Sequence, residues 1–114
     1  MIIEISNAAQ QDLLDGYHFY EAQTEGLGTY FLDSLTSDID SLIIYAGIHT
    51  LHFGDYYRLL GKRFPFAVYY RVEEIIIRIY AVLDCRQNPV WIRTQLVNAI
   101  ADMASHPRTP EELS

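Results

Sequence analysis

The sequence lacks several features that would place it in a specialised class of protein. It contains one cysteine, Cys85, so no intramolecular disulfide can form and packing alone must hold the fold. No apolar run reaches the roughly 18 residues needed to cross a bilayer, and the N-terminus lacks the basic start and long apolar core of a signal peptide. We therefore expect a cytoplasmic protein with no membrane partner.

Positive charge is absent from the first half of the chain. Residues 1–57 contain no lysine or arginine and nine acidic residues, whereas residues 58–114 contain all eight basic residues and six acidic ones. The formal net charge of −7 therefore divides into −9 and +2. An asymmetry of this size predicts one acidic surface and one surface able to meet an anionic partner.

The length of 114 residues, with 50% hydrophobic and 20% charged residues, predicts one globular domain. The first half predicts a strand at residues 2–6 that ends at Ser6, a good helix N-cap. Apolar residues then recur at helical spacing over residues 7–24 and again after a glycine-containing break, which predicts a helix hairpin. The stripe of the second helix is Leu27, Phe31, Leu35, Ile39, Leu42 and Ile43. Asp33, Asp38 and Asp40 are expected to face solvent, and Tyr17, Tyr20, Tyr30 and Phe31 to form the hairpin core.

The period of the pattern changes to two after a loop at residues 46–55, which predicts an antiparallel sheet of three further strands. These strands span residues 56–64, 66–72 and 75–83, and a C-terminal helix follows at about residues 89–104. The expected core face consists of Phe66, Val68, Tyr70, Val72, Ile75, Ile77, Ile79, Ala81 and Leu83. We therefore predict an α+β fold: N-terminal strand, helix hairpin, antiparallel sheet packed on the helices and C-terminal helix. Residues 97–114 form a C-terminal extension, with a frayed tail from residue 106.

The opposite face of this sheet would remain open and would gather most of the positive charge. Tyr69, Arg71, Arg78 and Tyr80 are expected on that face, with Arg58, Lys62 and Arg86 near its margins. We call Arg58, Lys62, Arg71, Arg78 and Arg86 the cationic platform. Pairing of Arg71 and Arg78 with Glu73 or Glu74 is the plainer interpretation of these two arginines. Trp91 is expected to anchor the terminal helix in the core, with contact to a partner as the alternative.

Two segments carry a resemblance to a known family. The stretches YYRLLGKRFPFAVYYRV and IIIRIYAVLDCRQNPVWI, together with ISNAAQQDLLDGYHFYEAQTEGLGTYFLDSL near the N-terminus, resemble the RelE/ParE toxin superfamily of bacterial type II toxin–antitoxin modules. The resemblance covers residues 1–96. It implies a small toxin that forms a hetero-oligomer with a cognate antitoxin, whose segment of apolar anchors and acidic residues lies on the sheet and the hairpin.

The resemblance leaves the target open between DNA gyrase, as for ParE-like members, and mRNA in the ribosome, as for RelE-like members. Metal-free RNA cleavage needs proton-transfer groups and cations around the phosphate, and the strands offer tyrosines and Lys62 without a histidine. The family's C-terminal tyrosine is also missing after Trp91, and a net charge of −7 disfavours general RNA binding. We therefore favour a gyrase-binding toxin with no catalytic residue, over a ribosome-dependent endoribonuclease and a non-toxic binding module.

No cofactor or metal site is predicted. His49 and His52 lie near Asp55 in sequence, but two histidines and one carboxylate on a loop are a weak metal signal without a fourth ligand. The residues predicted to bind the target or the antitoxin are Arg58, Lys62, Tyr69, Arg71, Arg78, Tyr80, Arg86 and Trp91.

Overall fold

The computed structural model describes the backbone of residues 1–52 and 54–105, and their side chains up to residue 99. The predicted tail from residue 106 lies outside the described residues. In chain order the elements are β1 (Ile2–Ile5), α1 (Asn7–Gln23), α2 (Leu27–Asp40), α3 (Leu42–Tyr45), β2 (Leu51–His52), β3 (Tyr56–Leu60), β4 (Phe66–Glu73), β5 (Ile76–Asp84) and α4 (Pro89–Ser105). The α+β fold is as predicted. Among the described residues, no helix combines the length and apolar character needed to span a bilayer.

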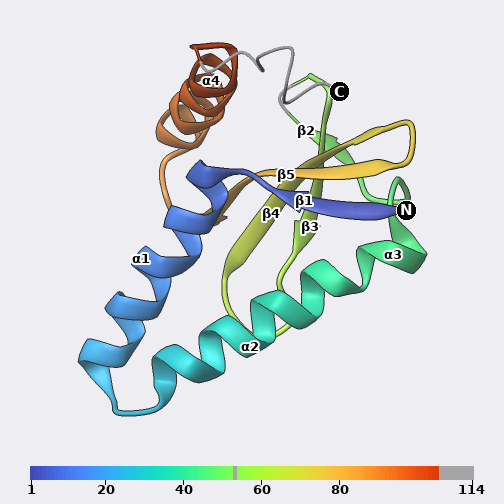
Figure 1. The fold of residues 1–114 in the computed structure, drawn as a ribbon. Helices are drawn as coiled ribbons and strands as arrows, with labels where there is room; N and C mark the ends of the chain where they lie inside the picture. Colours follow the sequence, from blue (N-terminus) through green and yellow to red (C-terminus); the bar gives the residue numbers. More distant parts are fainter. Residues whose placement is uncertain (53, 106–114) are drawn as a thin grey trace.

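The strands form one mixed sheet in the order β1-β5-β4-β3-β2. The neighbours β2 to β5 are antiparallel, whereas β1 pairs in parallel with β5 at the edge of the sheet (Figure 1). β2 was not predicted, because its two residues are too few to show a period and lie among turn residues. The prediction that residues 46–55 are entirely loop is therefore wrong.

The helix hairpin follows the local chemistry of the sequence. Ser6 caps α1, because its side chain accepts a hydrogen bond from the backbone N–H of Ala9 at 3.1 Å. The carboxylate of Glu21 accepts hydrogen bonds from the backbone N–H groups of Gly26 and Gly28, which satisfies donors at the start of α2. These bonds fix the turn between the two helices.

One core cluster joins the hairpin to the sheet. Its buried residues are Ala9, Leu13, Tyr20, Phe31, Leu35, Ile39, Leu42, Leu59, Phe64, Phe66, Val68, Tyr70, Ile77, Ile79 and Val82. Three expectations for this region are wrong. Tyr30 and Ile43 are half-exposed, because their neighbours Phe31 and Leu42 take the buried positions, although the Tyr30 ring still lies 5.5 Å from that of Phe64. Asp38 is buried, with its Oδ2 accepting a hydrogen bond from the backbone N–H of Lys62 at 3.2 Å.

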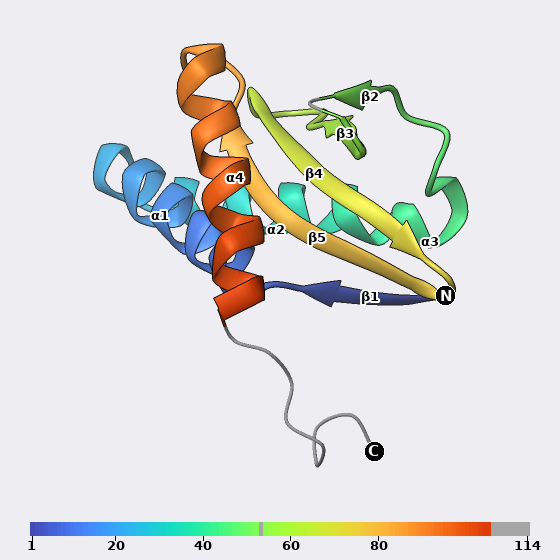
Figure 2. The same ribbon diagram turned by 90° about the horizontal axis from the view of Figure 1, so that it is seen from above.

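A second core cluster lies on the other face of the sheet, where α4 packs (Figure 2). Its buried residues are Tyr56, Ala67, Tyr69, Tyr80, Ala81, Leu83, Ile92 and Leu96. α4 therefore covers part of the face that was expected to be open. The sheet is buried between the hairpin on one side and α4 on the other.

A β-bulge reverses the alternation of side chains in the middle of β5. Ile79 and Ala81 pair with adjacent residues of β4, so Tyr80 is an extra residue in β5. Beyond it Val82 packs toward the hairpin, whereas Ala81 and Leu83 pack toward α4. The predicted core face is therefore right for Ile79 and wrong for Ala81 and Leu83, since strict alternation assumes a strand without a bulge. Ile75, also assigned to that face, is exposed and precedes β5.

Candidate protein-binding site

The two tyrosines predicted on the open face are buried beneath α4. Tyr69 is 1% exposed and Tyr80 is 6% exposed. Burial raises the pKa of both hydroxyl groups. Both side chains therefore belong to the packing between the sheet and α4, and the prediction that they lie exposed is wrong.

Arg71 lies on this same face and is stacked on aromatic rings. Its guanidinium carbon is 4.5 Å from the ring centre of Tyr56 and 5.4 Å from that of Tyr80. Such contacts are attractive and fix the orientation of the guanidinium group. Within the described part of the chain Arg71 forms no ion pair, and neither its Nε atom nor the Tyr56 hydroxyl has a hydrogen-bond partner.

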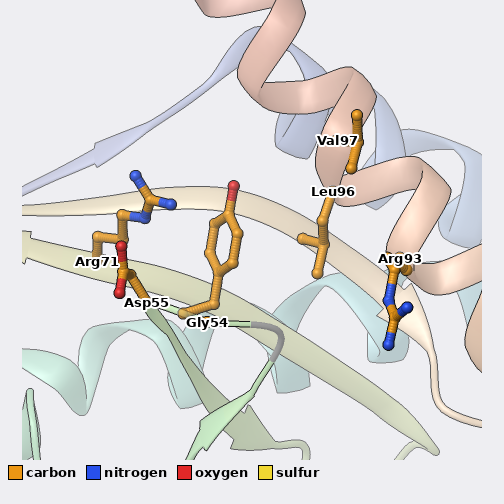
Figure 3. A pocket seen from close by; sticks show the side chains of 7 residues that line it. Gly54, Asp55, Arg71, Arg93, Leu96 and Val97 are labelled. Carbon is orange, nitrogen blue, oxygen red and sulfur yellow. The ribbon is translucent and has the colours of Figure 1, made fainter.

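A pocket of about 420 Å³ lies beside this arginine. It is lined by Gly54, Asp55, Tyr56, Arg71, Arg93, Leu96 and Val97. Figure 3 shows Arg71 and Arg93 at opposite ends of the pocket, with Leu96 of α4 between them. The formal charges of the lining residues sum to +1, so the pocket combines apolar walls with a weak preference for an anion.

Arg78 lies at the same end of the sheet but is neutralised by carboxylates. Its Nε is 3.5 Å from Oε2 of Glu73, and its Nη2 is 3.8 Å from Oε2 of Glu4. The Tyr80 hydroxyl donates a hydrogen bond to the other oxygen of Glu73 at 3.1 Å. Arg78 therefore forms the ion pair with Glu73 that was its plainer interpretation.

The remaining residues of the cationic platform lie apart from Arg71 and Arg78. Arg86 follows the end of β5 and pairs with Asp84, whose Oδ2 is 2.7 Å from the Arg86 Nη2. This hydrogen bond lowers the pKa of the Asp84 carboxyl group. Lys62 is exposed in the turn between β3 and β4. The platform is thus divided between the two ends of the sheet.

Arg58 lies inside β3, close to a histidine of the segment that was predicted to be a loop. His52 of β2 pairs directly with Tyr56 of β3, so these two side chains share a face of the sheet. Burial and the positive charge of Arg58 lower the pKa of His52. His52 lies beside Tyr56 only because β2 pairs with β3. A strand of two residues leaves no periodic pattern, so no signal in the sequence indicates this position of His52.

Trp91 does not anchor α4, contrary to expectation. It is 40% exposed, whereas the next residue, Ile92, is 6% exposed and belongs to the second core cluster. Leu96 and Ala99 follow at helical spacing and are also buried. Trp91 therefore lies on the exposed side of α4, where its indole is available to a partner.

The described residues contain no group of three or more histidine, cysteine, aspartate or glutamate side chains that could hold a metal ion. His49 instead lies within 2.5 Å of the Tyr70 hydroxyl through its Nδ1 atom. The arrangement of the site is thus one of arginines, aromatic rings and apolar walls.

Comparison with known proteins agrees with this fold. A solved structure described as the chromosomal ParDE TA system from P. aeruginosa matches with a TM-score of 0.65 and 20% sequence identity, over 72% of this chain and 92% of that chain. At this identity the likeness shows the fold alone. No curated protein matches the chain.

The family model for the ParE toxin of the type II toxin–antitoxin system parDE matches residues 3–89. The match extends from the second residue of β1 to the first residue of α4, and it includes the helix hairpin and all of the sheet except Ile2. The chain therefore belongs to the ParE toxin family. This confirms the resemblance inferred from the sequence.

Proposed function

We propose that this ParE-type toxin acts by binding DNA gyrase and that a cognate antitoxin neutralises it. The observation that carries the proposal is the match to the ParE toxin family over residues 3–89. The pairing of Arg78 and Arg86 with carboxylates supports it, because two of the five platform residues then offer little free charge to an RNA phosphate. Binding to a protein target requires no catalytic residue.

The antitoxin, in this proposal, contacts the toxin through apolar anchors and acidic side chains. The pocket beside Arg71 suits such a segment, since its walls are apolar and its formal charge is +1. A carboxylate there would meet a guanidinium that is oriented by two rings and has no ion pair within the described residues. Arg58, Lys62 and Trp91 remain candidates for contacts with gyrase or the antitoxin.

A supercoiling assay with purified gyrase tests the target. We expect the toxin to inhibit supercoiling or to accumulate cleaved DNA, and the co-expressed product of the adjacent gene to relieve the inhibition. Arg71→Gln should weaken this relief about ten-fold, because truncating one member of a charge pair removes affinity. Arg63→Gln, in the exposed turn, is the control and should leave relief intact. Full gyrase activity at a large excess of folded toxin would contradict the proposal.

Cleavage of mRNA is a second candidate function, favoured by one observation. His52 shares a face of the sheet with Tyr56, and the guanidinium group of Arg71 stacks on the Tyr56 ring. Burial and the charge of Arg58 lower the pKa of His52 and so favour the neutral imidazole. A neutral imidazole beside arginines is suited to removing a proton from a 2′-hydroxyl. Codon-phased cuts that appear on induction and disappear in His52→Gln would establish this function, and intact transcripts would exclude it.

A further inference from the structure

A second hollow lies between α1 and α4, at the end of β5. Its volume is about 560 Å³, and we call it the α1–α4 groove. Its lining is Asp12, Asp15, Gly16, Phe19, Phe66, Val82, Leu83, Asp84, Arg86, Gln87, Trp91 and Gln95. β1 pairs with β5 only as far as Ile79, so within the described residues the last part of β5 has no strand neighbour on this edge. The groove follows that edge.

Two exposed aromatic side chains stand on opposite walls of the groove. Phe19 of α1 is 54% exposed and Trp91 of α4 is 40% exposed. Between them the lining includes Val82 and Leu83 of β5, whose side chains are almost wholly buried. Exposed aromatic residues such as these are enriched among the side chains that contribute most of the affinity in protein interfaces.

The charges of the groove are of the opposite sign to those of the pocket beside Arg71. Its three aspartates and one arginine give a formal charge of −2. Arg86 is paired with Asp84, so the unbalanced carboxylates are Asp12 and Asp15 on the wall formed by α1. Asp12 accepts a hydrogen bond from the backbone N–H of Val82 at 2.9 Å, which holds it at the edge of β5.

We propose that the α1–α4 groove binds a segment of a protein partner that places an apolar side chain between Phe19 and Trp91 and a lysine or arginine against Asp12 and Asp15. The apolar walls favour an apolar side chain of the partner, and the net negative charge of the groove favours a positively charged residue next to it. This inference goes beyond the proposed function, because it concerns the chemistry of one groove and does not depend on gyrase being the target. A partner that also reaches Arg71 would carry side chains of both signs.

Trp91 is the only tryptophan in the chain, so its fluorescence reports on the groove directly. The probe is a tetrapeptide of lysine, leucine, leucine and lysine, blocked at both ends and titrated into the full chain. We expect saturable binding with a blue shift of the Trp91 emission, since the anchor removes water from the indole. A peptide with glutamine in place of both lysines should bind about ten-fold more weakly.

Two pairs of substitutions separate the groove from the overall charge of the protein. Asp12→Asn with Asp15→Asn should weaken binding of the lysine peptide about ten-fold, whereas Asp33→Asn with Asp40→Asn, at exposed positions of α2, should change it less than about two-fold. Both pairs change the net charge equally. Asp15→Asn alone, at an exposed position, and Phe19→Ser provide variants that leave the half-buried Asp12 intact.

If both pairs of substitutions weaken binding of the lysine peptide equally, the proposal is overturned. The peptide would then be attracted by the net negative charge of the whole protein and not by the groove. Equal affinity for the lysine and glutamine peptides would overturn the proposal as well. So would binding without a change in Trp91 emission, since the peptide would then occupy another surface. Circular dichroism and thermal melting of each variant establish that the fold is retained.

Discussion

The ionisation of Asp12 is coupled to the fold by burial. Burial raises the pKa of its carboxyl group to about 6, with the nearby charge of Asp15 acting in the same direction, while the hydrogen bond from Val82 opposes the shift. The folded pKa lies above the unfolded value of 3.8. Between these values the folded state binds more protons, so this residue's contribution to stability falls as pH rises from about 4 to about 6.

We expect Asp12→Asn to remove this dependence. The amide oxygen can still accept the hydrogen bond from Val82, and no charge is left to bury. The free energy of unfolding of the wild-type protein relative to the variant should fall by about 2 kcal/mol between pH 4 and pH 7. Urea denaturation at intervals of half a pH unit measures it, with Asp33→Asn on the surface of α2 as control. A constant difference across this range would show that Asp12 is not destabilised when ionised.

The residues that the sequence misplaced share a physical cause. Asp38 was expected in solvent because it is charged, yet it is 3% exposed and binds the backbone of Lys62 across 24 positions of the chain. Trp91 was expected in the core because it is large and apolar, yet α4 turns its neighbour Ile92 inward. Residue type gives a preference for burial, whereas the tertiary neighbour decides it.

The two hairpin helices approach each other at glycines. A Cβ atom added to Gly16 of α1 would lie 2.4 Å from the ring of Phe31, and one added to Gly28 of α2 would lie 2.6 Å from the carbonyl oxygen of Tyr17. Both distances are far shorter than a van der Waals contact. The absence of side chains at these two positions therefore allows the close packing of α1 on α2.

Gly16→Ala should destabilise the protein, although alanine is the better helix former. The intrinsic preference for alanine in a helix is worth about 1 kcal/mol, whereas the overlap with the buried ring of Phe31 costs about 1–3 kcal/mol through overpacking. Ala22→Gly, at an exposed position of α1, isolates the helix preference as a control. Urea midpoints give both values. A stabilised Gly16→Ala variant would show that Phe31 moves aside freely.

Periodicity predicted most elements well and their packing less well. The predicted helices and strands agree with α1, β4, β5 and α4 to within about two residues. The predicted stripe of the second helix spans both α2 and α3, and β3 ends at Leu60, four residues before the end of the predicted strand. The bulge at Tyr80 and the two-residue strand β2 leave no periodic signal, because both depend on hydrogen bonds to another strand. The sequence also could not show which face of the sheet α4 covers, since both faces carry apolar residues.

The expected cationic platform depends on how its residues are arranged in space, which the sequence did not specify. Arg58, Arg71 and Arg78 lie on the sheet, whereas Arg86 follows β5, and ion pairs with Glu73 and Asp84 occupy Arg78 and Arg86. Only the tertiary structure places Arg93, Phe19 and Asp12 in a pocket or groove, because each lies on a helix whose partner surface the sequence does not specify. The function predicted from the sequence therefore rested on the resemblance to a toxin family, because the geometry of the site could not be predicted.

The distribution of charge over the whole molecule predicts weak binding to nucleic acid. The net charge is −7, and Arg78 and Arg86 are already paired with carboxylates. Because affinity for a polyanion depends on how many phosphates free cations can neutralise, we expect a dissociation constant weaker than about 10⁻⁴ M for an eight-nucleotide RNA at physiological ionic strength. Fluorescence anisotropy at two salt concentrations measures both the affinity and its salt dependence.

Micromolar binding with a steep dependence on salt would contradict this expectation and favour the ribonuclease. The variant Glu73→Gln is an informative control, because it releases one partner of Arg78 while Glu4 still faces that guanidinium group. If ion pairing suppresses RNA binding, this variant should bind RNA more tightly than the wild-type protein, by up to about ten-fold. Equal weak binding by both proteins would instead show that the overall negative charge dominates, which is the behaviour expected of a toxin whose target is another protein.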